Sequence, residues 1–180
     1  MMEIGQYTYG YNNIRICYTH PGEKLTVGKF CSIGKNLQIY LGGNHNMNWV
    51  TTFPFGHILQ QEFDNFNGDG HPSSKGSIEI RNDVWIGDNV TIMSGVTIGD
   101  GCVIANNSHV IKNAKPYSLI GGNPAKFIKF RFTEKQIESL LHIKWWDLDK
   151  DIINTISPLL CSDNIDNCIS TCLRLVSTTS

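Results

Sequence analysis

The sequence predicts an all-β solenoid, a parallel β-helix, with an α-helical cap at its C-terminal end. Three features of the chain predict it. Aliphatic residues recur at every sixth position, a long tract without this repeat interrupts it, and a helix-start signal opens a different pattern at residue 133.

The six-residue repeat is clearest in "IEIRNDVWIGDNVTIMSGVTIGDGCVIANNSHVI", residues 78–111. Each hexad holds one large aliphatic residue and a smaller residue four positions later. The large positions are Ile80, Ile86, Ile92, Ile98, Ile104 and Val110, and the small ones are Val84, Val90, Val96, Cys102 and Ser108. A short strand and a sharp turn in every hexad make three flat faces per coil of about 18 residues. Glycines occur near the expected corners, where a positive φ suits them, at positions 87, 95, 99 and 101.

The same repeat begins earlier, at Val27, Ile33 and Ile39, and is absent from residues 42–77. A tract of this length inside a compact fold is usually functional or disordered. Its aromatic content argues against disorder: it contains Trp49, Phe53, Phe55, Phe63 and Phe66. We therefore predict an ordered excursion, from about residue 42 to about residue 77, that leaves one corner of the β-helix.

The C-terminal part of the chain is predicted to be helical. "TEKQ" is a capping box with Thr133 as N-cap, and apolar residues follow it at helical spacing. Two further helices are expected, from about Asp149 to Leu160 and from about Asp163 to Leu175. The sequence thus predicts a β-helix domain over residues 1–130 and a helical cap and tail over residues 131–180.

Composition excludes several classes of function. The 180 residues carry a net charge of −1, so there is no electrostatic footprint for nucleic acid or an anionic membrane. No apolar run approaches the roughly 20 residues of a membrane span, and "MMEIGQYTYGY" does not have the pattern of a signal peptide. We expect a cytoplasmic protein whose six cysteines are plain thiols, with no metal site.

Residues 82–132, "NDVWIGDNVTIMSGVTIGDGCVIANNSHVIKNAKPYSLIGGNPAKFIKFRF", resemble the core of the hexapeptide xenobiotic acetyltransferases. "GGNHNMNWVTTFPF" resembles the start of that family's extruded loop, and "IKWWDLDKDII" resembles its C-terminal helix pair. The resemblance implies a left-handed β-helix that assembles into a homotrimer. It also implies that acetyl-CoA, the cosubstrate, lies along the prism and that the active sites lie between subunits.

Acetyl transfer requires a group that takes a proton from the acceptor, and histidine suits this role near neutral pH. His71, in "NGDGHPSSKGS", lies near the end of the excursion, where its place resembles the family's catalytic histidine. We therefore predict His71 as the general base, in direct transfer within a ternary complex. His45, in "GGNHN", resembles a residue that lines the acceptor pocket or holds the loop in place.

Binding residues are also expected, some from the resemblance and some from residue type and place in the chain. For acetyl-CoA, Trp85 is expected beside the thioester, backbone groups at Gly87, Ala105 and Asn106 at the pantetheine arm, and Lys112 and Lys126 at the phosphates, with Arg131 assisting. The residues expected to bind the acceptor are Tyr9, Asn44, His45, Trp49 and Phe53.

The predicted function is an acetyl-CoA-dependent O- or N-acetyltransferase. Its preferred acceptor is a sugar, either a nucleotide-linked amino sugar or a surface glycan. The alternative within enzymes is an antibiotic-inactivating O-acetyltransferase that acts on a streptogramin A or chloramphenicol. A remote alternative is a non-catalytic β-helix that serves as a binding module.

Overall fold

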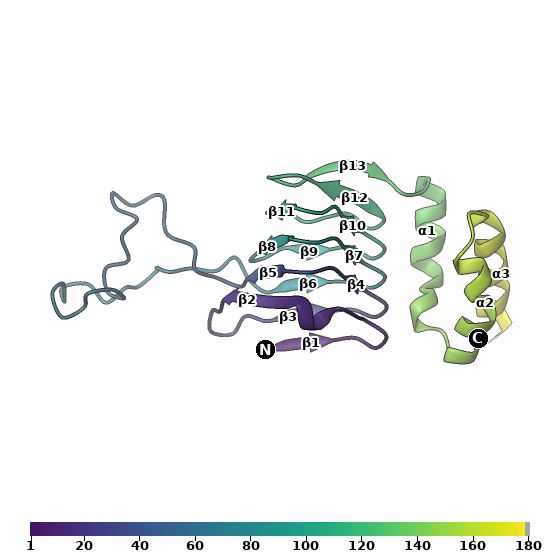
Figure 1. Ribbon diagram of the computed structural model, residues 1–180, viewed down its shortest axis with the longest axis horizontal. Coiled ribbons are helices and arrows are strands. Elements are labelled where there is room, and N and C mark those ends of the chain that lie inside the picture. The colour runs from purple at the N-terminus through teal and green to yellow at the C-terminus, as the bar shows by residue number, and fades with distance from the viewer. Residues whose placement is uncertain (179–180) are drawn as a thin grey trace.

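The structure, a computed structural model, describes residues 1–178 and contains a three-sided β-helix followed by three helices. Each coil contributes one short strand to each of three sheets, and the strands pair in parallel with those of the next coil (Figure 1). This arrangement is that of a left-handed β-helix of hexapeptide repeats, so the predicted fold class is confirmed.

The three sheets are named A, B and C in the order in which each complete coil, beginning with β3, contributes to them. Sheet A contains β1 (Met2–Ile4), β3 (Leu25–Val27), β6 (Ile78–Ile80) and β9 (Thr97–Ile98). Sheet B contains β4 (Ser32–Ile33), β7 (Trp85–Ile86), β10 (Val103–Ile104), β12 (Ser118–Gly121) and β13 (Lys126–Phe130). Sheet C contains β2 (Ile14–Tyr18), β5 (Leu37–Tyr40), β8 (Thr91–Met93) and β11 (His109–Val110). The strand β13 runs antiparallel to β12 and closes the last coil.

The register of the strands confirms the 18-residue coil. Ile86 pairs with Ile104, 18 residues later, whereas Ile33 pairs with Ile86, 53 residues later. The difference of 35 residues is the length that the excursion adds to one coil.

The hexads form the core as predicted. All six large positions, from Ile80 to Val110, are at most 1% exposed, and the five small positions are at most 2% exposed. A single apolar cluster fills the prism and also includes Val27, Ile33 and Ile39 of the earlier coils. Burial of these side chains stabilises the coils from within.

The corners use more than glycine. A residue in the left-handed region recurs every six positions, with φ between 55° and 75°, at Asp83, Asn89, Gly95, Gly101 and Asn107. Aspartate and asparagine tolerate this conformation better than other side chains with a Cβ. Gly87 and Gly99 have no positive φ, and their role is steric. A Cβ on Gly87 would lie 2.1 Å from Oδ1 of Asn106 in the next coil.

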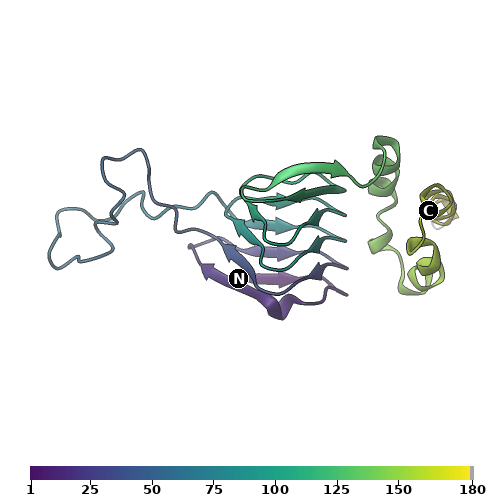
Figure 2. The same ribbon diagram turned by 45° about the horizontal axis from the view of Figure 1, so that its top comes forward.

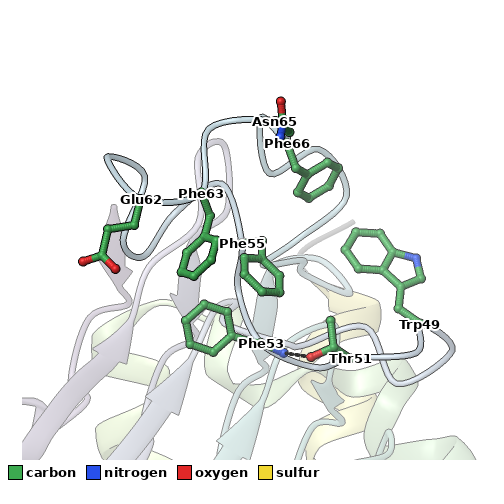
Figure 3. A pocket seen from close by; sticks show the side chains of 8 residues that line it. All are labelled: Trp49, Thr51, Phe53, Phe55, Glu62, Phe63, Asn65 and Phe66. Carbon is green, nitrogen blue, oxygen red and sulfur yellow. Dashed lines mark hydrogen bonds between the residues drawn. The ribbon is translucent and has the colours of Figure 1, made fainter.

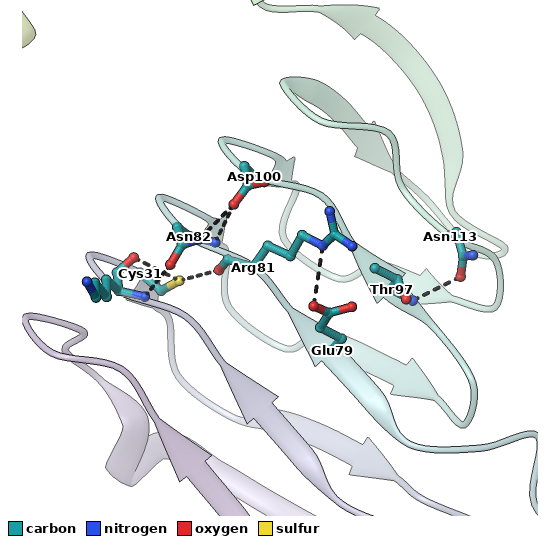
Figure 4. Close-up of polar contacts among 8 residues, drawn as sticks. Cys31, Glu79, Arg81, Asn82, Thr97, Asp100 and Asn113 are labelled. Carbon is teal, nitrogen blue, oxygen red and sulfur yellow. Dashed lines mark hydrogen bonds and ion pairs between the residues drawn. The ribbon is translucent and has the colours of Figure 1, made fainter. Parts of the chain in front are cut away.

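Polar side chains connect successive coils at one corner (Figure 4). Oδ1 of Asn82 accepts from the backbone N–H of Lys29, and Oδ1 of Asp100 accepts from the backbone N–H of Asn82. These N–H groups lie at turns, where no neighbouring strand supplies a carbonyl acceptor. The side-chain oxygens therefore act as the acceptors. The excursion leaves from a different corner.

The excursion joins β5 of sheet C to β6 of sheet A and projects away from the prism (Figures 1 and 2). Backbone hydrogen bonds close turns within it, for example from His57 to Pro54 and from Phe63 to Leu59. Its aromatic rings pack on one another, as the prediction of an ordered segment requires.

The cap lies on the side of the prism away from the excursion (Figure 2). It contains α1 (Glu134–Ile143), α2 (Lys150–Leu160) and α3 (Ile165–Thr178), and short 3-10 helices occur at Tyr11–Asn13 and Trp145–Asp147. The predicted capping box at Thr133 is present. None of the described helices is long and apolar enough to cross a bilayer. The domain boundary at residue 130 stays a prediction.

Arg131 fastens the cap to the prism. Its guanidinium donates to the carbonyl of Gly101, pairs with Asp83 at 3.8 Å, and lies over the rings of Tyr117 and Phe132. The expectation that Arg131 assists at the phosphates of CoA does not fit these contacts, which already engage its charged group.

Candidate active site

The two ends of the excursion meet in a short stem beside the prism. Asn44 and Ser73 exchange backbone hydrogen bonds of 3.0 and 2.9 Å. The side chain of Asn44 also donates to the carbonyl of Ser73 and to Oγ of Ser94 in the next coil along the chain. The amide of Asn44, which was predicted to bind the acceptor, is therefore engaged in holding the stem.

His71 belongs to this stem and is only 2% exposed. The backbone N–H of Asn46 donates to its Nδ1 over 3.2 Å, so the proton of the neutral ring lies on Nε2. Burial, with smaller contributions from His45 and His57, lowers the pKa of His71 and favours that neutral ring. Neither nitrogen then offers a free lone pair to an acceptor hydroxyl. This hydrogen bonding does not fit the role of general base that the sequence predicted for His71.

His45 lies next to His71 with the opposite tautomer. Its Nδ1 is 2.8 Å from the carbonyl oxygen of Thr52, and because a carbonyl only accepts, Nδ1 carries the proton and Nε2 keeps its lone pair. The two imidazole rings meet edge to face at 4.6 Å. The side chain of His45 is exposed, so a ligand can approach Nε2.

Beyond the stem, the excursion folds around an apolar pocket of about 460 Å³ (Figure 3). Its lining residues are Trp49, Thr51, Phe53, Phe55, Glu62, Phe63, Asn65 and Phe66. Trp49 connects this pocket to the stem, because its indole also stacks on the ring of His71 at 5.5 Å. Thr52, the partner of His45, lies between two lining residues, and Oγ1 of Thr51 accepts from the N–H of Phe53.

The structure thus brings together His45, Trp49 and Phe53, three of the residues that the sequence predicted to bind the acceptor, and that role stays a prediction. Three further lining residues, Phe55, Phe63 and Phe66, were recognised in the sequence only as a sign of order. Their size in a projecting loop was the signal that could have identified a pocket, since exposed clusters of large apolar side chains often mark binding sites.

A second hollow, of about 400 Å³, lies on the outer face of sheet B. Trp85, 58% exposed, lines it together with Ala105, Asn106 and Leu119, so three of the predicted cofactor residues come together. The backbone N–H groups of Gly87 and Ala105 donate to the carbonyls of Ile104 and Ile120, respectively. The carbonyl of Ala105 also accepts from Oγ of Ser108 at 2.6 Å. The N–H groups of Gly87 and Ala105 are therefore not available to the pantetheine arm, and the role of their carbonyls stays a prediction.

A third pocket, of about 500 Å³, lies at the last coil under the β12–β13 hairpin. Lys112 and Lys126, both predicted to meet the CoA phosphates, line it. The sequence interpretation missed Lys115, Phe127 and Phe130, which line the same pocket. Three ammonium groups beside aromatic rings match the chemistry of a phosphorylated adenosine.

The histidine pair and the Trp85 hollow lie on opposite sides of one chain. The excursion leaves at the corner between sheets C and A, and sheet B is the face opposite that corner. The filled core separates them. Tyr9 pairs with Ser32 in β4 of sheet B, so within one chain it does not join the acceptor pocket as predicted. Among the described residues, no three His, Cys, Asp or Glu side chains gather as metal ligands would.

Comparisons with known proteins agree with this fold. The family model described as "Bacterial transferase hexapeptide (six repeats)" matches residues 77–112. A probable macrolide acetyltransferase of Lysinibacillus sphaericus is 46% identical over 147 residues, which cover 76% of this chain and 77% of the relative. A chloramphenicol acetyltransferase of Morganella morganii is 40% identical over 177 residues, which cover 91% of this chain and 84% of the relative.

A solved structure is also similar. The hexapeptide-repeat acetyltransferase VCA0836 of Vibrio cholerae, complexed with acetyl-CoA, superimposes with a TM-score of 0.53 and 29% identity. The match covers 73% of this chain and 61% of that chain.

Stacked hexapeptide coils with a tryptophan-lined hollow on one face and a histidine-bearing loop define an acyltransferase of the β-helix class. The chain belongs to the hexapeptide-repeat xenobiotic acetyltransferase family, so the predicted resemblance is confirmed. It is an acetyl-CoA-dependent acetyltransferase.

Proposed function

We propose that this enzyme inactivates antibiotics by transferring an acetyl group from acetyl-CoA to a hydroxyl of an apolar, ring-rich acceptor. The candidate acceptors are a streptogramin A, chloramphenicol or a macrolide. The observation that carries the proposal is the apolar pocket of five aromatic rings that begins at the histidine pair. Apolar rings favour a largely apolar ligand, with a few polar groups to orient it.

A sugar, the acceptor preferred from the sequence, fits the pocket less well. Sugars bring many hydroxyl groups that need hydrogen-bond partners, and the polar side chains that line the pocket are Thr51, Glu62 and Asn65. The names of the relatives, a macrolide and a chloramphenicol acetyltransferase, also favour the antibiotic alternative.

We assign the role of general base to His45 rather than to His71. Nε2 of His45 has the lone pair that takes the acceptor's hydroxyl proton, and Nδ1–H stays bonded to the carbonyl of Thr52, which stabilises the imidazolium that forms. Acetyl-CoA supplies the thioester. The acceptor oxygen attacks the carbonyl carbon of this thioester and displaces the CoA sulfur. The proton on Nε2 then passes to the departing sulfur, which returns His45 to its neutral state.

We place acetyl-CoA along sheet B. Trp85 on β7 and the pocket beside β12 and β13 lie on the same five-stranded sheet, with β10 between them. The lysine pocket is lined by the inward residues Ser118 and Ile120 of β12, whereas the Trp85 hollow lies on the outer face of the sheet. An extended ligand would therefore run along the outer face from the indole, at the thioester end, and turn over the last coil to Lys112, Lys115 and Lys126, at the phosphates.

Because this groove faces away from the histidine corner of the same chain, a complete site needs a second copy. We propose a homotrimer in which the excursion of one subunit brings His45 to sheet B of its neighbour. The projecting excursion, with a pocket that its own prism does not cover, supports this arrangement (Figure 1).

The test follows release of free CoA thiol from acetyl-CoA in the presence of chloramphenicol, a streptogramin A, a macrolide and a nucleotide-linked amino sugar. We expect release with at least one antibiotic and none with the sugar; release with the sugar alone would refute the proposed acceptor class. His45→Ala should lower turnover by about 10²–10⁴-fold. His142→Ala, a change of an exposed histidine on α1, is the matched control and should leave turnover unchanged.

A further inference from the structure

The role of His71 is open once His45 is assigned as the base. The ring of His71 is almost fully buried, and its Nε2–H finds no hydrogen-bond partner among the described residues. Leaving a buried donor unpaired typically costs about 1–3 kcal/mol, so an apolar side chain would suit the position better if only packing mattered. The contacts of the ring indicate what it does instead.

The first contact fixes the backbone around His45. Nδ1 of His71 accepts from the N–H of Asn46, the residue directly after His45. On the other side of His45, Asn44 is held by its two backbone hydrogen bonds to Ser73. The backbone is therefore held immediately before and after the proposed base, and His71 supplies one of the two attachments.

The second contact supports the ring of His45 itself. The rings of His45 and His71 meet at 4.6 Å with an interplanar angle of 72°, while Trp49 stacks on His71 at 5.5 Å and 26°. His71 thus lies between the indole and the base. His45 is exposed, and its own hydrogen bond, to the carbonyl of Thr52, fixes only one edge of the ring.

We propose that His71 is a positioning residue for His45: its neutral, buried ring holds the neighbouring imidazole against the carbonyl of Thr52, and that hydrogen bond keeps the proton on Nδ1 and leaves Nε2 free for the acceptor. This inference rests on the proposed function, in which His45 is the base. A protonated His71 could not accept from Asn46, and its lowered pKa, caused first by burial and then by His45 and His57, keeps Nδ1 available.

Ring-nitrogen NMR on the ¹⁵N-labelled protein tests this without any acceptor, because the shifts of the two ring nitrogens report the tautomer of each histidine. In the native protein we expect His45 protonated on Nδ1 and His71 on Nε2. In His71→Leu, which fills the site with an apolar side chain but loses the acceptor atom, His45 should become a mixture of tautomers. His71→Asn should keep His45 largely in the native tautomer, since its Oδ1 can accept from Asn46.

His57→Asn is the matched control. His57 lies in the same excursion and bonds to the carbonyl of Gly68, so its replacement perturbs the loop without touching His45. The control should leave the tautomer of His45 unchanged. If His57→Asn released His45 as much as His71→Leu does, or if neither variant did, the positioning role would be refuted.

Kinetics provides a second readout once an acceptor is identified. His71→Leu should lower kcat about 10- to 100-fold with little change in KM for acetyl-CoA, since small displacements of a reacting group have effects of this size. Because His71 acts through His45, the double variant His45→Ala/His71→Leu should be no slower than His45→Ala. A further drop in the double variant would mean an independent or merely structural role and would overturn the inference.

The two proposals fail separately. Full turnover in His45→Ala would remove the base assignment, and with it the catalytic part of this inference, while the NMR result still decides whether His71 fixes the ring. Loss of turnover in His45→Ala with a fully active His71→Leu would leave the proposed function intact and refute the positioning role.

Discussion

Replacing the three lysines of the third pocket by glutamine should weaken binding of acetyl-CoA selectively. Lys112, Lys115 and Lys126 line one pocket of about 500 Å³, and all three are exposed. Exposed ion pairs contribute about 0.5–1 kcal/mol each, because water and salt screen them. Three such contacts amount to about 1.5–3 kcal/mol, which corresponds to a roughly 10- to 150-fold increase in KM for acetyl-CoA.

The assay measures KM for acetyl-CoA at low salt and at 1 M salt. Because the screening length falls to about 3 Å at 1 M, the gap between the native protein and the triple variant should narrow there. The acceptor KM should not change, and Lys135→Gln on α1 serves as a control that removes an exposed lysine elsewhere. An unchanged KM for acetyl-CoA in the triple variant at low salt would refute the placement of the phosphates.

Three further predictions concern the pocket, a corner and the core. Phe63→Ala removes a ring of the proposed acceptor pocket, one that does not stack on His71. It should raise the KM for the acceptor about 5- to 30-fold and leave the KM for acetyl-CoA unchanged. An equal rise in both KM values would mean that the acceptor binds elsewhere. Burial, opposed in part by Arg131, raises the pKa of Asp83 to about 6. Its protonated form therefore favours folding, a contribution that is complete below its ordinary pKa of about 4 and is lost as pH rises through about 6. Asn tolerates the positive φ of this corner, so Asp83→Asn should remove the pH dependence without straining the backbone. In urea titrations between pH 4 and 7, the native protein should lose about 1–3 kcal/mol of unfolding free energy and the variant should not. The same pH dependence in both proteins would contradict this assignment to Asp83. Ile92→Ala, at a fully buried position of β8, should cost about 2–5 kcal/mol of unfolding free energy, whereas the neighbouring outward Thr91→Ala should cost far less.

The repeat made the prism predictable because each coil repeats the same local rule. The inward positions, from Ile80 to Val110, follow from spacing alone and are buried as expected. The corners were only partly predictable. Glycine was recognised at positions 95 and 101, but Asp83, Asn89 and Asn107 take the same left-handed conformation without that signal.

The site was less predictable, because the choice between histidines depends on hydrogen bonds between distant residues. His45 and His71 both stood out in the sequence, but the carbonyl of Thr52 and the N–H of Asn46 determine which nitrogen of each ring carries a proton. Backbone groups have no residue-specific pattern, so the sequence carried no sign of either contact. For a similar reason the sequence could not show that the N–H of Gly87 is already engaged, since only the next coil reveals the carbonyl that takes it.

The excursion begins and ends at one corner, between β5 and β6, and each of these strands pairs with strands of neighbouring coils. The length of the excursion therefore does not affect the register of the strands that follow it. One residue added within residues 78–110 would move the later aliphatic residues of the coils out of the interior. Residues inserted near Phe63 would leave the inward positions of the coils unchanged. The proposed acceptor pocket can therefore be remodelled, lengthened or grafted from another protein as a cassette, and such enzymes can acquire new targets during evolution without rebuilding the surface on which we place acetyl-CoA.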